Sequence, residues 1–128
     1  MLRGTLVVVI AVVVALLLWP EQVDGLIPLV AYSLPFSAPA QHAVLVALGL
    51  LLNVALFVPV GAIVGLVTKQ FWLGCFIGFA MSAVLEAAQA FLPSRNADPV
   101  DVICNSVGAA VGALIARSVL KRRGRAIS

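Results

Sequence analysis

Long apolar runs separated by short polar stretches dominate the pattern along this chain. Four runs have the length and composition of membrane-crossing helices: about residues 5–19, 42–67, 71–92 and 99–120. None shows the alternating ten-residue pattern of a membrane β-barrel. Hydrophobic residues make up 63% of the 128 residues and charged residues 10%, against about 45–50% and about 25% in soluble domains. We therefore predict an all-α integral membrane four-helix bundle, with residues 1–128 forming a single membrane domain.

The first two predicted spans are joined by the longest connection of the chain, residues 21–41. Pro28, Pro35 and Pro39 interrupt it, so we predict a long outer loop whose apolar part, residues 26–36, lies in the membrane interface. The apolar run near the N-terminus also fits the start of a signal peptide. However, the cleavage-like Ala-Pro-Ala at 38–40 lies too far beyond that run, so we expect the segment to be retained.

Basic residues predict the orientation in the membrane. With the N-terminus inside, only Arg95 faces the outside, in a loop over residues 93–98. Residues 117–128 then form a basic cytoplasmic tail, and both termini are cytoplasmic. This tail could bind anionic lipid, but the simpler interpretation is that it fixes the topology. The basic residues placed inside are Arg3, Lys69, Arg117, Lys121, Arg122, Arg123 and Arg125.

Small residues recur at helical spacing in the last three spans, and polar residues fall into the same stripes. Residues four apart share one helix face, and small side chains on that face let two helices approach closely. We therefore predict that these faces point into the bundle, whereas the first span, which has no stripe, lies at its lipid-exposed edge. The stripes are Gly49, Asn53, Phe57, Gly61 and Gly65; Gly74, Gly78, Ser82 and Glu86; and Asp101, Asn105, Gly108 and Gly112.

Ionisable and amide side chains within or beside the spans are the main candidates for a functional site. A charged group at the centre of a membrane helix costs about 2.5–3.5 kcal/mol on insertion scales, so such groups usually face an interior or a cavity. Their depths along the helices allow them to converge on one pocket that opens outward. The candidate binding residues are Asn53, Gln89, Arg95, Asp98 and Asn105, and the candidate acid/base residues are Glu86 and Asp101.

The carboxylates of this set decide which chemistry is open to it. Glu86, Asp98 and Asp101 accompany the single Arg95, and buried carboxylates this close cannot all stay ionised without a partner. Glu86, the deepest acid, could act as a general acid or base. An all-oxygen set would suit a divalent ion such as Mg²⁺, but no fixed metal signature is present, so the cofactor stays open. Before Pro99, Asp98 also fits a helix N-cap, with Asp101 placed for a capping box.

These motifs, taken together, resemble those of the VanZ-like family. The resemblance covers residues 53–113, within a core of about 42–116. It implies a small multi-pass protein of the bacterial plasma membrane, in a family whose founding member is linked to resistance to the glycopeptide teicoplanin. It does not imply a particular reaction. The motifs are Asn53-x-x-x-Phe57-x-Pro59-x-Gly61, Glu86-x-x-Gln89, Arg95-x-x-Asp98-x-x-Asp101 and Asn105-x-x-Gly108-x-x-x-Gly112.

Two functions of different classes fit this sequence. In the first, the polar site binds or acts on an envelope lipid or a peptidoglycan-related amphiphile, Arg95 engages a phosphate or carboxylate, and the protein contributes to glycopeptide resistance. In the second, the protein is a non-catalytic scaffold whose polar face holds the bundle or docks a partner. A proton-linked transporter is less favoured, because the chain has no inverted repeat. Nothing predicts a nucleic-acid partner; the ligand, catalysis and the oligomeric state stay open.

Overall fold

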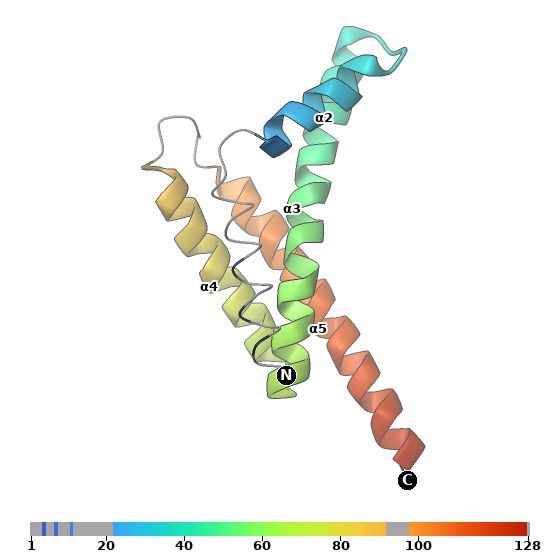
Figure 1. Cartoon of the computed structure of the whole chain (residues 1–128), viewed down its shortest axis with the longest axis vertical. Helices are drawn as coiled ribbons and strands as arrows, with labels where there is room; N and C mark the ends of the chain where they lie inside the picture. Colours follow the sequence, from blue (N-terminus) through green and yellow to red (C-terminus); the bar gives the residue numbers. More distant parts are fainter. Residues whose placement is uncertain (1–3, 5–6, 8–10, 12–21, 92–97, 128) are drawn as a thin grey trace.

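Four helices make up most of the computed structural model, which describes Gly4, Val7, Ala11, residues 22–91 and residues 98–127 (Figure 1). They are α2 (Gln22–Ser33), α3 (Ala38–Thr68), α4 (Phe71–Gln89) and α5 (Pro99–Ile127). No strand occurs within these ranges. The predicted all-α class is therefore confirmed.

Three of the helices are long and apolar enough to cross a bilayer: α3, α4 and the Pro99–Gly124 part of α5. With 19 residues, α4 is about 28 Å long, close to the thickness of a hydrocarbon core of about 30 Å. Three of the four predicted spans are thus confirmed. The predicted span 5–19 lies outside the described residues, apart from Val7 and Ala11, which are helical. The direction of insertion stays a prediction.

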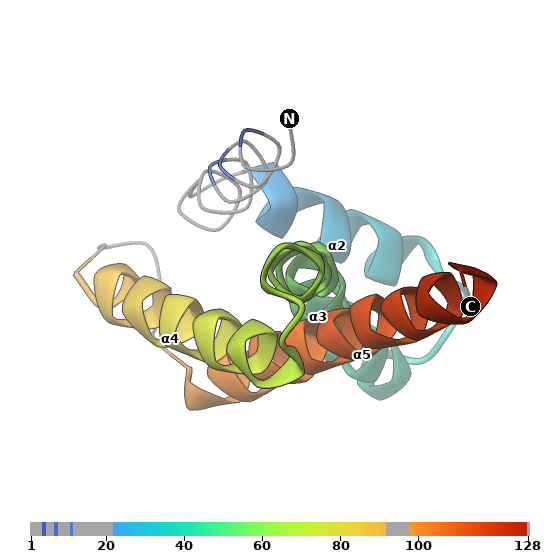
Figure 2. The same cartoon turned by 90° about the horizontal axis from the view of Figure 1, so that it is seen from below.

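The connection over residues 21–41 is not an irregular loop along its length, because α2 occupies Gln22–Ser33. Pro28 lies inside this helix, where it removes one backbone hydrogen bond without ending it. At about 18 Å, α2 is too short to cross a bilayer. Gln41 closes the turn into α3, since its side-chain amide donates to the Leu34 carbonyl at 3.0 Å. Figure 2 shows α2 on one side of α3 and the α4/α5 pair on the other.

Glycines set how closely α3 and α5 cross, which is the most extensive helix contact in the described fold. A Cβ on Gly112 would collide with the Val58 carbonyl oxygen, and one on Gly61 with the Ala109 carbonyl oxygen. Backbone therefore packs directly on backbone, as the predicted inner stripes require. Gly49 is the exception in its stripe, because a Cβ there would meet nothing within 4 Å.

Large apolar side chains cover the outside of the helices, which is typical of a protein surrounded by lipid. Trp72 is 79% exposed, Phe76 65% and Ile103 63%, whereas the small central core is formed by Phe57 and its neighbours. A soluble monomer rarely exposes so many large apolar side chains. Exposure of this kind therefore agrees with the three spans identified from length and composition.

Candidate functional site

The start of α5 is tied to the end of α4 through two carboxylates. The Asp98 side chain accepts a hydrogen bond from the Val100 backbone N–H at 2.9 Å, which confirms Asp98 as the helix N-cap. The backbone N–H of Asp98 itself donates to Oε1 of Glu86. In a capping box this N–H is satisfied from within the same helix. Here the acceptor for this N–H is the carboxylate of Glu86, which lies on the preceding helix. The bond therefore ties the start of α5 to the end of α4.

Asp101, one turn into α5, faces α3. Its Oδ1 accepts a hydrogen bond from Nδ2 of Asn53 at 2.6 Å, across 48 residues of sequence. Both side chains are partly buried between the helices. An ionised acceptor makes such a bond shorter and stronger than a bond between neutral groups. The contact joins the deepest predicted amide to a predicted carboxylate, so these two candidates do come together.

Asn105 and Ser82 form a second polar contact, one turn deeper along α5. Asn105 is 4% exposed and Ser82 is 1% exposed, and Nδ2 of Asn105 donates to Oγ of Ser82 at 2.9 Å. Within the described part of the chain, Oδ1 of Asn105 is buried without a hydrogen-bond partner. Native proteins contain few such atoms, and each one marks strain, a role in function or a missing partner molecule.

Ser82 was not among the candidate binding residues, although it lies in the polar stripe of α4. Its hydroxyl could be expected to satisfy itself on its own helix, as that of Ser106 does on the Val102 carbonyl. The sequence held one indication of its role: Ser82 lies one turn from Glu86, on the same helix face as Gly74 and Gly78. Only the packed structure identifies Asn105 as its partner.

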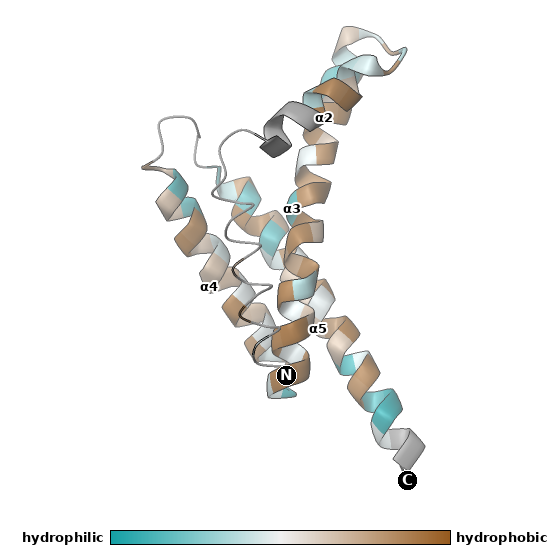
Figure 3. Cartoon of the chain, in the orientation of Figure 1, coloured by the Kyte–Doolittle hydropathy of each residue, from teal (hydrophilic) through white to brown (hydrophobic). Residues whose placement is uncertain are grey.

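These contacts define a polar cluster at one end of the α3/α4/α5 bundle, visible as hydrophilic patches on α4 and α5 in Figure 3. Gln89, 6% exposed, is buried near the end of α4, whereas Asp98 is exposed at the mouth of the cluster. Arg95 lies outside the described residues. The polar cluster consists of Asn53, Ser82, Glu86, Gln89, Asp98, Asp101 and Asn105.

The polar cluster combines carboxylate acceptors with amide groups in a largely apolar setting. Such a set can accept hydrogen bonds from hydroxyl, amine or ammonium groups, and its carboxylates can exchange protons. In the described ranges, no group of three or more His, Cys, Asp or Glu side chains is arranged to hold a metal ion. Its clearest chemical property is therefore hydrogen-bond acceptance by Asp101 and Asn105.

Comparison with known proteins gives one result. A family model described as VanZ/LLP1 matches residues 6–121, a longer stretch than the motifs over residues 53–113. No curated protein and no solved structure matches the chain significantly.

Proposed function

Because the chain belongs to the VanZ/LLP1 family and has three helices fit to cross a membrane, we propose that its polar cluster binds the headgroup of an envelope amphiphile. The amphiphile would be a lipid or a peptidoglycan-related molecule of the bacterial plasma membrane. The protein would lie with both termini in the cytoplasm and the cluster toward the outer leaflet, as the distribution of basic residues predicts.

The buried, unpartnered Oδ1 of Asn105 carries this proposal. A buried acceptor without a donor costs about 1–3 kcal/mol, and a donor on a bound ligand would remove this cost. A ligand hydroxyl or ammonium group would supply that donor. It would lie near the Asp101 carboxylate, one helical turn toward the membrane surface. We expect Arg95 to engage a phosphate or carboxylate of the same headgroup, and Glu86 and Asp101 to act as acid/base groups if a reaction follows.

The experiment is native mass spectrometry of the full chain in nanodiscs made from host lipids. The wild-type protein should retain an amphiphile that bears a hydroxyl or amine. Asn105→Leu should retain it at least about tenfold less, since a lost buried hydrogen bond weakens binding by this order. Ser106→Ala is the matched control, because its hydroxyl bonds only to its own helix and the substitution leaves the cluster intact. Equal retention by wild type and Asn105→Leu would refute the proposal.

A second measurement tests glycopeptide resistance separately. In a host without its own family member, expression of the wild-type protein should raise the teicoplanin concentration that stops growth, and Asn105→Leu should not. An unchanged growth limit with the wild-type protein would contradict the resistance role, while the retained amphiphile would still report on binding.

The alternative is a cluster that only holds the helices together or docks a partner. The two bonds Asn53–Asp101 and Ser82–Asn105 favour it, because each joins two helices. On this alternative Asn105→Leu lowers the free energy of unfolding and the abundance of the protein without changing what it retains. Retention of the amphiphile, measured beside thermal unfolding of the same variants, therefore separates the two functions.

A further inference from the structure

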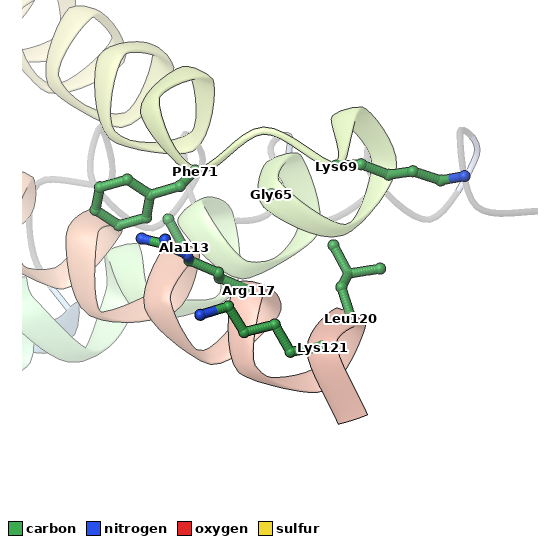
Figure 4. A pocket seen from close by; sticks show the side chains of 7 residues that line it. All are labelled: Gly65, Lys69, Phe71, Ala113, Arg117, Leu120 and Lys121. Atoms are coloured by element: carbon green, nitrogen blue, oxygen red, sulfur yellow. The ribbon is translucent and has the colours of Figure 1, made fainter. Parts of the chain in front are cut away.

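A second polar feature lies at the opposite end of the bundle from the polar cluster. There the end of α3, the start of α4 and the second half of α5 line a pocket of about 330 Å³ (Figure 4). Its basic lining residues are Lys69, Arg117 and Lys121, and Phe71 forms its aromatic wall. Arg117 lies about 27 Å along α5 from Pro99, so the pocket falls at the other face of a bilayer of about 30 Å.

The cations of this pocket have no carboxylate partner among the described residues. The Arg117 guanidinium lies 5.9 Å from the centroid of the Phe71 ring, which holds it without neutralising it. In Figure 4 the side chains of Arg117 and Lys121 extend toward the start of α4, and Lys69 extends the other way. The carboxylates of Glu86, Asp98 and Asp101 belong to the polar cluster at the far end of the bundle.

We propose that Arg117 and Lys121 bind a phosphate oxyanion, supplied by the headgroup of an anionic phospholipid. The planar guanidinium can donate two parallel hydrogen bonds to phosphate oxygens, and the Lys121 ammonium adds a second positive charge. Basic pockets between membrane helices are suited to such headgroups. This site is separate from the polar cluster in place and in the sign of its charge, so it does not depend on the proposed function.

The surroundings of the pocket fit a lipid better than a free ion. Trp72 follows Phe71 directly, packs against it with ring centroids 5.0 Å apart and is 79% exposed. Tryptophan at this position is typical of the membrane–water interface. Phe76, one turn further along α4, is 65% exposed and offers an apolar surface to an acyl chain. A headgroup in the pocket would thus have its hydrocarbon chains in the bilayer.

The test compares two pairs of substitutions that remove the same charge from the full chain. Arg117→Gln with Lys121→Gln removes the pocket cations, while Arg122→Gln with Arg123→Gln removes two exposed cations of the same helix that do not line the pocket. Each protein is placed in nanodiscs of phosphatidylcholine with a small fraction of phosphatidylglycerol. Native mass spectrometry then counts the bound phosphatidylglycerol. A separate arm adds inorganic phosphate to nanodiscs of phosphatidylcholine alone.

The protein with Arg117→Gln and Lys121→Gln (the pocket pair) should retain about tenfold less phosphatidylglycerol than wild type. The protein with Arg122→Gln and Arg123→Gln (the control pair) should retain as much as wild type. Exchanging the cations, Arg117→Lys with Lys121→Arg, should restore most of the retention, which a folding defect would not allow. Equal losses in both pairs would mean diffuse attraction to the tail and would overturn the proposal, as would no loss in either. In the phosphate arm, wild type and the control pair could bind inorganic phosphate while the pocket pair does not. That outcome would support the oxyanion site but would identify a free phosphate, and not a phospholipid, as its ligand.

Discussion

Asn53 and Asp101, 48 residues apart in sequence, form a 2.6 Å hydrogen bond between α3 and α5. The bond lies on the side of the helix crossing where the polar cluster is found, and the glycine contacts continue from it toward the other end. Polar pairing and close backbone packing thus act on the same two helices. Each should depend on the other, because the bond forms only at the helix separation that the glycines allow.

The Asn53–Asp101 pair should show a measurable coupling energy. Hydrogen bonds between membrane helices average about 0.6 kcal/mol in double-mutant cycles and reach about 1.7 kcal/mol. We expect a value near the upper end, because the acceptor is a carboxylate. The cycle uses Asn53→Leu, Asp101→Leu and the double variant, with reversible unfolding in detergent as the measurement. A coupling energy near zero would show that the bond does not stabilise the crossing.

Substitutions of Glu86 should separate its structural contact from its charge. Glu86→Gln keeps an oxygen that can accept from the Asp98 N–H, whereas Glu86→Ala leaves that N–H without this acceptor. Asp98 is exposed, so water can partly replace the lost acceptor, and we expect Glu86→Ala to lower the free energy of unfolding by about 0.5–1.5 kcal/mol and Glu86→Gln by less.

The amount of amphiphile that these variants retain then shows whether the charge of Glu86 takes part in binding. If this carboxylate takes part in binding, Glu86→Gln should lose the amphiphile while its unfolding transition stays close to that of wild type. A Glu86→Gln protein as unstable as Glu86→Ala would instead show that the negative charge itself holds α4 and α5 together.

Two glycines of α3 and α5 make a matched pair for the packing argument. Gly112→Ala places a methyl group against the Val58 carbonyl, so we expect a loss of about 1–3 kcal/mol as α3 and α5 are pushed apart. Gly49→Ala meets open space and should be neutral or gain up to about 1 kcal/mol from helix propensity. Unfolding midpoints of both variants check this order. Equal effects would mean that the crossing is loose.

Lys69 ends α3 in the left-handed region, with a φ of 58°. A side chain in this conformation costs about 1–2 kcal/mol, and glycine avoids the cost. Lys69→Gly should therefore raise the free energy of unfolding by about 1 kcal/mol although it removes a charge. Lys69→Gln, which removes the charge but keeps the side chain, is the control and should not stabilise the protein.

The positions of α3, α4 and α5 could be predicted from hydrophobicity because long apolar runs have few alternatives in a bilayer. The inner faces were also predictable, since Gly61, Gly112 and their neighbours repeat at helical spacing. In contrast, α2 was missed because three prolines suggested a loop. Pro28 occurs inside the helix all the same, which a local rule about proline does not anticipate.

The partners within the polar cluster could be predicted only in part. Spacing placed Asp98 as an N-cap and put Asn53 and Asp101 on inner faces. It could not determine that Glu86 accepts from Asp98 or that Ser82 meets Asn105. Those contacts depend on the relative rotation and height of two helices, which a period of 3.6 residues within one helix does not specify.

The last helix continues without a break from its N-cap through the basic segment to Ile127. Its positive charges are therefore held at fixed angles around one axis, unlike those of a flexible tail. Inserting a single alanine after Val119 would turn every later residue by about 100° and carry Lys121 away from Arg117. The chain would keep all its charged residues, its net charge and its topology signal, yet the two cations would no longer share a face. Angular register, as well as the number of charges, is thus part of what this segment encodes.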